Sequence, residues 1–199
     1  DTPILIAAEF MPCPESDPVA LSSALAHLIK EYNLYDKKCA FVLNADDYEL
    51  FILDKPDVGK DDVRNAILSE IKEYIDYPIE EAILQISDLK ISGDEIGKVF
   101  IVVAKSLIIS NVTDSINSTD LELIAIDIPE FSYRNLVASS KYADETVGFI
   151  EMNEDDTKLI LLQDGLFFMS RFFPMGYSYI NEAGVENQEG ELNKINCEE

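Results

Sequence analysis

The sequence alternates short apolar runs of strand length with longer segments in which apolar residues recur at helical spacing. This alternation constrains the fold more than any other feature, because it sets the order of strands and helices. The runs of strand length are residues 4–10, 40–43, 48–53, 82–86, 99–104, 123–126, 147–152, 158–162 and 166–172. The helical segments begin near Asp17, Asp61, Ser106 and Pro129. This order predicts an α/β (α+β) fold with mixed sheets.

Capping and turn residues predict where several of these elements begin and end. Asp17 is a good helix cap, and Pro18 is suited to the first helical position. Ser106 is predicted to cap the third helix, and Pro129 to open the fourth. The last three strands are predicted to form a meander, with turns at residues 153–156 and 163–165 and an end at Gly176.

The apolar pattern also predicts which elements are neighbours. The turn-forming residues 44–47 predict a hairpin between the strands at 40–43 and 48–53. The strands at 82–86 and 99–104 are predicted to be adjacent, and the helix at 61–74 is predicted to pack on strands 48–53 and 82–86. The main sheet is predicted to contain residues 40–43, 99–104, 123–126 and 147–152.

Charge limits the classes of partner. The chain has 15 basic and 39 acidic residues, a net charge of −24, yet 47% of its residues are hydrophobic. A field of this sign repels the phosphates of nucleic acids and opposes docking on an anionic bilayer, whereas it favours a basic protein partner. No run of about 18 apolar residues occurs, so no membrane span is predicted.

The cysteines and the acidic residues at the end of the chain indicate the cellular compartment and the state of the tail. Cys13, Cys39 and Cys197 form no CxxC pair and no zinc spacing, which is typical of thiols in a reducing cytoplasm. Residues 181–199 hold six acidic residues and one lysine. They predict a solvated or disordered acidic tail, with a helix that packs only in a longer chain as the other hypothesis.

Catalytic motifs are not found. The single histidine, His27, and the lack of GxSxG argue against a Ser-His-Asp site, so His27 is interpreted as an ordinary helix residue. Residues 93–98, Gly-Asp-Glu-Ile-Gly-Lys, have three residues between the glycines where a phosphate loop needs four. They also lead into a strand instead of a helix, so they predict a turn.

Two clusters near the end of the chain each allow two interpretations. An acidic group is either a charged turn or a set of oxygen ligands for a hard cation. Its members are Glu151, Glu154, Asp155 and Asp156. An aromatic group is either the buried face of a strand or a stacking platform. Its members are Phe167, Phe168, Phe172 and Phe173.

A set of segments spread over residues 4–176 resembles the MshI-type biogenesis proteins of the mannose-sensitive haemagglutinin pilus. These are similar to the pilus protein PilM and to the cytoplasmic part of the secretion protein GspL. The stretch at residues 126–136, Ile-Asp-Ile-Pro-Glu-Phe-Ser-Tyr-Arg-Asn-Leu, is the most distinctive. The other matching segments are residues 48–56, 75–82, 100–104, 123–125, 147–151, Ser170-Arg171 and Gly176.

The resemblance implies an actin-like (ribonuclease H-like) fold with an inserted small subdomain. It places the main lobe at residues 1–45 and 92–145, the insertion at 46–91, the start of a second lobe at 146–180 and the acidic tail at 181–199. Actin-like ATPases hold phosphates between two glycine-containing hairpins, where glycine lets N–H groups approach phosphate and an acid holds magnesium. On this resemblance the first hairpin lies before residue 4, and the second is a degenerate turn at Glu151, Asn153, Asp155 and Asp156, without glycine.

This departure implies lost or weak nucleotide binding. We therefore expect a non-catalytic cytoplasmic scaffold at the inner-membrane face of a bacterium, which contacts other inner-membrane pilus-assembly proteins. No cofactor and no metal is expected. Residues 129–136 and the final meander are the predicted contact surfaces. Two alternatives stay open: an actin-like ATPase that uses ATP and magnesium, with its first phosphate loop upstream of Asp1, and an unrelated acidic adaptor.

Overall fold

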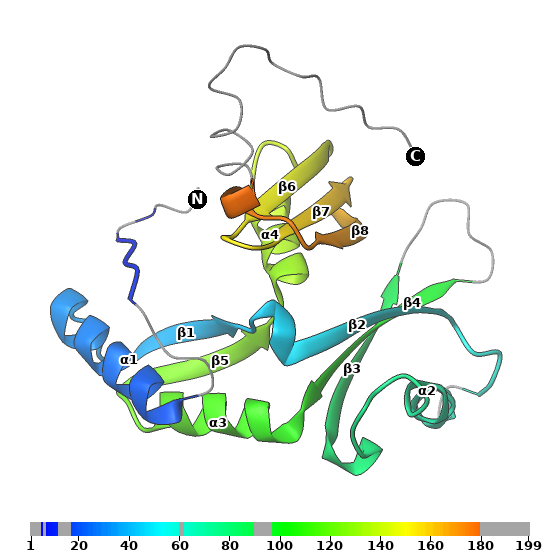
Figure 1. Ribbon diagram of the computed structural model, residues 1–199, viewed down its shortest axis with the longest axis horizontal. Helices are drawn as coiled ribbons and strands as arrows, with labels where there is room; N and C mark the ends of the chain where they lie inside the picture. Colours follow the sequence, from blue (N-terminus) through cyan, green and yellow to red (C-terminus); the bar gives the residue numbers. More distant parts are fainter. Residues whose placement is uncertain (1–4, 6, 12–16, 60–61, 90–96, 180–199) are drawn as a thin grey trace. The chain divides into compact units, whose positions relative to one another are not determined.

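The structure, a computed structural model, describes residues 5, 7–11, 17–59, 62–89 and 97–179. It divides into an N-terminal unit, Asp1–Ser132, and a C-terminal unit, Tyr133–Glu199. The elements within the described residues are labelled in Figure 1, apart from two short 3-10 turns, η1 and η2. In chain order they are α1 (Pro18–Tyr32), β1 (Lys37–Val42), η1 (Ala45–Asp47), β2 (Tyr48–Asp54), α2 (Val63–Ile71), η2 (Ile79–Glu81), β3 (Ala82–Leu89), β4 (Lys98–Lys105), α3 (Ser106–Asn117), β5 (Leu121–Asp127), α4 (Pro129–Ala138), β6 (Thr146–Met152), β7 (Thr157–Gln163) and β8 (Leu166–Phe173).

The first helix begins as the sequence predicts. The Asp17 carboxylate accepts hydrogen bonds from the main-chain N–H groups of Val19, at 2.9 Å, and Ala20, at 3.2 Å, and Pro18 is the first helical residue. The predicted cap of the third helix is wrong. Ser106 is instead the first residue of α3, because β4 runs directly into the helix and Lys105 occupies the N-cap position.

A parallel pair of strands lies beside α3 in the N-terminal unit. β1 pairs with β5, which comes much later in the chain, whereas β2 pairs antiparallel with β4. The predicted hairpin between residues 40–43 and 48–53 is therefore wrong. Residues 44–47 do turn the chain, through η1, but they lead it into a different sheet. Turn-forming residues specify a change of direction, not the strand that becomes the partner.

The second sheet of the N-terminal unit is antiparallel, in the order β2-β4-β3, and α2 covers one of its faces. Ile67 and Ile71 of α2 are fully buried against Ile101 and Val103 of β4. Two predictions are thereby confirmed: the helix packs on the β2 and β3 strands, and the strands at 82–86 and 99–104 are adjacent. The other face, at its Tyr48 end, packs in a second core. Its buried members are Leu43, Tyr48, Ala104 and Ile128.

The prediction of one main sheet is wrong. Its four segments fall in three different sheets of the described part of the chain: β1 with β5, β4 with β2 and β3, and β6 with β7 and β8. Apolar content identifies a strand but does not select its partner, because every buried strand offers the same main-chain edge. The predicted strand at residues 4–10 is also not found, since Leu5 and residues 7–10 have no strand conformation.

Some predictions lie outside the described residues or stay predictions. Ile4 and Ile6 of the first predicted strand, residues 93–96 of the glycine-containing turn and the acidic tail at 181–199 are outside the described residues. The domain boundaries that the resemblance implies stay predictions.

The C-terminal unit contains the predicted meander. α4 begins at Pro129, as predicted, and passes from the first unit into the second. β6, β7 and β8 pair antiparallel in sequence order. The β7–β8 turn has Asp164 at φ 52° and Gly165 at φ 68°, a left-handed pair typical of a tight hairpin. On one face of this sheet, Tyr133 of α4 stacks on Phe149 with ring centroids 4.5 Å apart.

The aromatic residues of β8 are mostly not buried. Only Phe167 is buried, at 4% exposure, whereas Phe168, Phe172 and Phe173 are 51%, 60% and 36% exposed. The predicted buried face is therefore wrong for three of the four. A register shift opposite Leu161 and Leu162 breaks the alternation of β8, and β8 is the last strand of its sheet.

Candidate functional site

The predicted phosphate turn is the tip of the hairpin between β6 and β7. The two strands stay paired up to Met152 and Thr157, which leaves the four residues 153–156 as the turn. The turn is closed by hydrogen bonds at its base. The Asn153 N–H donates to the Asp156 carbonyl at 2.8 Å, and the Asn153 side-chain amide donates to the Asp156 carboxylate at 2.9 Å.

A later segment of the chain lies directly against this turn. The N–H groups of Tyr177 and Ser178 donate to the carbonyls of Asn153, at 2.9 Å, and Glu154, at 3.0 Å. The Ser178 hydroxyl lies 2.6 Å from the Glu154 carbonyl and 3.2 Å from the Asp155 carboxylate. The first N–H groups of the helical turn at residues 177–179 therefore bind the protein's own carbonyl oxygens. These two N–H groups are not available to an anion.

Gly176 makes this close approach possible. A Cβ atom at this position would lie 2.2 Å from the Glu154 carbonyl oxygen and 2.3 Å from that of Asn153. Both contacts are with main-chain atoms, so no flexible side chain moves aside to relieve them. From the sequence, Gly176 was predicted to end the meander and belonged to the segments of the family resemblance. The sequence around Gly176 did not indicate its contact with Asn153 and Glu154, because these residues lie more than twenty positions earlier in the chain.

The four predicted site residues do not form one cluster. Asn153, Asp155 and Asp156 are together at the turn, whereas Glu151 contacts α4. The Tyr133 hydroxyl lies 3.5 Å from the Glu151 carboxylate. Burial, followed by the negative charge of Glu151, raises the pKa of Tyr133. Glu151 is thus part of the packing between α4 and β6.

The acidic turn has the wrong electrostatics for a polyphosphate. Glu154 and Asp155 are exposed and Asp156 is half-buried. A phosphate charge at about 4 Å from one carboxylate is repelled by roughly 4 kcal/mol at an effective dielectric of 20. Among the residues that the structure describes, no three His, Cys, Asp or Glu side chains are grouped to hold a metal ion. The arrangement presents the carboxylates of Glu154 and Asp155 to solvent, a surface suited to basic groups.

The distinctive stretch at residues 126–136 has a structural role that the sequence did not reveal. Glu130 is only 2% exposed, and the Tyr48 hydroxyl donates to its carboxylate at 2.7 Å. Asp127 accepts from the N–H of Ile128 at 2.9 Å and from the Ser132 hydroxyl at 3.3 Å. The two carboxylates at the start of α4 are favourably placed near the positive end of the helix dipole. They fix the first turn of α4 to the core of the N-terminal unit.

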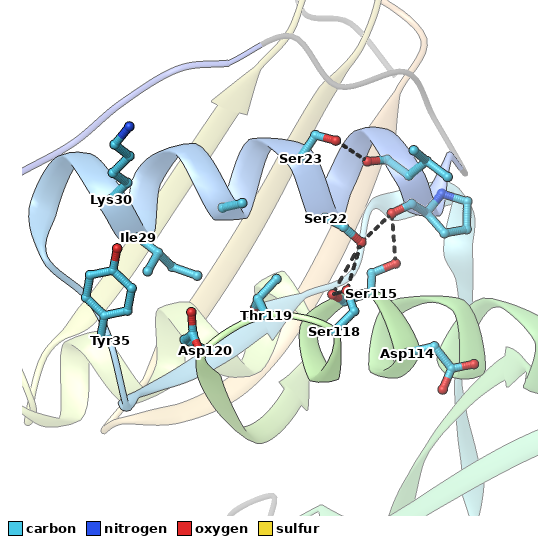
Figure 2. A pocket seen from close by; sticks show the side chains of 13 residues that line it. Ser22, Ser23, Ile29, Lys30, Tyr35, Asp114, Ser115, Ser118, Thr119 and Asp120 are labelled. Atoms are coloured by element: carbon cyan, nitrogen blue, oxygen red, sulfur yellow. Dashed lines mark hydrogen bonds between the residues drawn. The ribbon is translucent and has the colours of Figure 1, made fainter.

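A groove of about 700 Å³ lies between α1 and α3 (Figure 2). Hydroxyl groups form much of its wall, and they bind main-chain carbonyls. Ser22 and Ser115 both donate to the Pro18 carbonyl, at 2.7 Å and 3.2 Å, and Ser118 donates to the Ser115 carbonyl at 2.7 Å. Because these hydroxyls are satisfied within the protein, the groove is interpreted as the contact between two helices. No sequence signal had pointed to it.

Comparisons with known proteins identify the fold. No protein-family model and no curated protein matches the chain. Among solved structures, a chain of the PilM-PilN type IV pilus biogenesis complex aligns with a TM-score of 0.69 at 18% identity, over 88% of this chain and 54% of the other. The cytoplasmic domain of EpsL, an inner membrane component of the type II secretion system of Vibrio cholerae, aligns with a TM-score of 0.53 at 13% identity, over 87% of this chain and 64% of the other.

The chain thus spans between about half and two thirds of the structures that it resembles. The likeness confirms the predicted fold class, a mixed α/β (α+β) fold, which the chain shares with the PilM chain. No helix of the described residues is long and apolar enough to cross a membrane.

Proposed function

We propose that this chain is a non-catalytic scaffold in the biogenesis of a type IV pilus of the MSHA kind. It works by protein–protein contact at the cytoplasmic face of the bacterial inner membrane. The likeness of its fold to PilM and to the cytoplasmic domain of EpsL supports an assembly role. The observation that carries the non-catalytic part is the β6–β7 turn, whose carbonyls are bound by Tyr177 and Ser178 and whose side chains are acidic.

Nucleotide binding and hydrolysis test the proposal that the chain is not a catalyst. Phosphoryl transfer needs a metal, neutralised phosphate charge and a positioned water. The carboxylates of the acidic turn would repel the phosphates of ATP and would not neutralise their charge. Calorimetric titration with ATP, with and without magnesium, is expected to give no binding heat, and phosphate release is expected to stay at background. Magnesium-dependent turnover that Asp155→Ala abolishes would establish the ATPase alternative.

The salt dependence of binding tests the proposed basic protein partner. The PilM neighbour was solved as a complex with PilN. We propose that this chain likewise binds an inner-membrane pilus-assembly protein, through basic groups of that partner. With a net charge of −24, the association rate constant is expected to fall as salt screens the attraction over about 8 Å at physiological ionic strength. Surface plasmon resonance against the PilN-type protein of the same genome measures it. No binding to any pilus component, or nucleic acid carried through purification, would contradict the proposal.

The two predicted contact surfaces differ in exposure. Along α4, Glu130 and Val137 are buried at 2% and 3%, and Leu136 is 54% exposed. In the meander, three phenylalanines of β8 are exposed: Phe168 at 51%, Phe172 at 60% and Phe173 at 36%. This supports the meander as the contact surface. Phe172→Ala is expected to weaken partner binding by about tenfold, in the range of a central aromatic contact. Leu136→Ala, similarly exposed, is the matched control and is expected to leave binding unchanged. Equal effects would reject the choice of surface.

The remaining alternative, an unrelated acidic adaptor, is not favoured. It depends on a fold unlike that of PilM, and the TM-score of 0.69 argues against this. The acidic composition is then a feature of a chain that shares its fold with proteins of pilus biogenesis and type II secretion.

A further inference from the structure

Exposed apolar side chains gather at the end of the meander that carries the acidic turn. Met152 and Thr157 are the last paired residues of β6 and β7 at this end, and Thr157 lies opposite Phe173 of β8. The Thr157 hydroxyl donates to the Met175 carbonyl at 2.6 Å, so the chain after β8 stays beside the turn. We call Met152, Phe173, Met175 and Tyr177 the turn patch, and their exposed fractions lie between 36% and 49%.

Two exposed carboxylates, those of Glu154 and Asp155, lie beside the turn patch. The Tyr177 N–H donates to the Asn153 carbonyl and the Ser178 N–H to the Glu154 carbonyl. The Ser178 hydroxyl also lies 3.2 Å from the Asp155 carboxylate. These contacts place both acids next to Tyr177 in space, although more than twenty positions separate them from it in the chain.

Aromatic rings and thioethers beside two carboxylates match the side chain of arginine. The guanidinium group is planar, stacks on aromatic rings and forms paired hydrogen bonds with a carboxylate. Its alkyl stem packs on apolar surface, to which the flexible side chains of methionine adapt. The ammonium group of lysine is a compact and strongly hydrated charge, so it gains less from a ring. The turn patch is therefore better suited to arginine than to lysine.

Charge selects among the possible occupants of the turn patch. Residues 181–199, which follow it in the chain, contain six acidic residues and one lysine, so Glu154 and Asp155 repel them. A second copy of the chain, with its net charge of −24, and the phosphates of a nucleic acid are repelled in the same way. A basic segment of another protein has the complementary charge.

We propose that the turn patch binds an arginine side chain from a basic segment of a protein partner. The guanidinium group lies against the ring of Tyr177 and pairs with the carboxylates of Glu154 and Asp155. This inference rests on the proposed function, because the partner is the same basic assembly protein. It adds the place on the meander where that partner binds and the side chain that this place accepts.

Two short peptides serve as probes of the turn patch. Hexa-arginine and hexa-lysine carry the same charge, so the net charge of −24 attracts both, and the chemistry of their side chains makes the difference. Fluorescence anisotropy of the labelled peptides with the full chain at physiological salt measures both affinities. Hexa-arginine is expected to bind about fivefold more tightly, in the range of one exposed contact between a cation and a ring.

Two double variants with the same change of charge locate the site. Glu154→Gln with Asp155→Asn removes both carboxylates beside the turn patch and keeps the size of the side chains. Glu80→Gln with Glu81→Gln is the control, because these acids are also adjacent and exposed but belong to the N-terminal unit. The affinity for hexa-arginine is expected to fall about tenfold in the first variant and less than about twofold in the second.

Substitution of tyrosine by leucine separates the contribution of the ring from that of apolar bulk. Tyr177→Leu is expected to abolish the preference for hexa-arginine over hexa-lysine, because leucine has no aromatic face. Tyr142→Leu is the control, since Tyr142 is 45% exposed and Tyr177 is 46% exposed. This control is expected to keep the preference. Circular dichroism checks that every variant folds.

Three results would overturn the proposal: equal affinity for the two peptides, equal losses in the two double variants, or a preference that survives Tyr177→Leu. Equal affinity is also the result expected if another segment of the chain covers the turn patch. Binding of the PilN-type protein tests the proposed function separately. If that protein binds and the patch variants change nothing, the site is wrong and the function stands. If it does not bind while the peptides behave as expected, the function is wrong and the site stands.

Discussion

The sheet β2-β4-β3 and the meander β6-β7-β8 each have three strands in antiparallel pairing. In the first sheet, α2 packs on apolar residues of all three strands, whereas in the meander the helix contact is the stacking of Tyr133 of α4 on Phe149. α2 places Ile67 and Ile71 on the first sheet with no exposure. The meander leaves Ile150 and Met152, on the face opposite Phe149, 69% and 44% exposed. An apolar strand therefore supplies a buried core on the face that other segments cover, as at Ile101 and Ile160, and an open surface on the face that the described residues leave uncovered, as at Ile52 and Ile150. The difference lies in which segment covers the sheet.

The largest expected effect is in the covered sheet. Ile67→Ala removes a fully buried side chain from between α2 and β4. The free energy of unfolding is expected to fall by about 2–5 kcal/mol, since the loss combines transfer and cavity terms. Chemical denaturation followed by circular dichroism measures it. A loss below about 0.5 kcal/mol would mean that the face is not packed in solution.

The next effect concerns the closed turn of the meander. Gly176→Ala puts a Cβ within 2.2 Å of the Glu154 carbonyl oxygen, so the segment must move away from the turn. A destabilisation of about 1–3 kcal/mol is expected, with faster hydrogen exchange at Tyr177 and Ser178. Gly148→Ala is the control. Its Cβ meets only the Leu161 side chain, at 3.2 Å, which moves more easily. Equal effects would show that the turn is not closed.

A smaller effect is expected at the edge of the covered sheet, where Glu49 lies near Asp76 and Lys105. Burial, and then the negative charge of Asp76, raises the pKa of Glu49 above 4.5, against the opposing influence of Lys105. The folded state therefore holds the Glu49 proton more tightly than the unfolded state. Stability falls as the pH rises from about the unfolded value of 4.5 to the higher folded pKa, and ionised Glu49 stays unfavourable at neutral pH.

Glu49→Gln tests this sign. At neutral pH the variant is expected to be more stable than the wild type by less than about 1 kcal/mol, because solvent screens a partly accessible carboxylate. Below pH 4.5 the difference is expected to vanish. Thermal unfolding at a series of pH values measures it. A variant that is less stable at neutral pH would mean that the attraction to Lys105 exceeds the burial and the repulsion.

The smallest expected change in the free energy of unfolding is that of Ile150→Ala, which contrasts with Ile67→Ala. Ile150→Ala removes a side chain that is 69% exposed, so the monomer is expected to lose less than about 0.5 kcal/mol. Chemical denaturation followed by circular dichroism measures this. A loss as large as that of Ile67→Ala would mean that Ile150 is buried in solution, and the comparison between the two sheets would fail.

The sequence determined the local features of this protein. The Asp17 cap, Pro129 at the start of α4 and the tight turn at Asp164 and Gly165 follow from the conformations and hydrogen bonds of a few adjacent residues. The stripe of α2 likewise predicted which strands it packs on, since those strands flank it in the chain. The residues of the acidic turn were also found, apart from Glu151, which contacts Tyr133 instead.

Only the tertiary structure decided which distant segments meet. The pairing of β1 with β5, the contact of Gly176 with the 153–156 turn and the Tyr48–Glu130 hydrogen bond each join residues far apart in the chain. The main-chain edge of a strand accepts any other strand, and a short turn accepts any segment that fits, so local composition does not select among them. Shape and packing of the whole unit make that selection. For the same reason the continuous apolar run of β7 indicates that both of its faces are covered, without specifying what covers the face of Leu159 and Leu161.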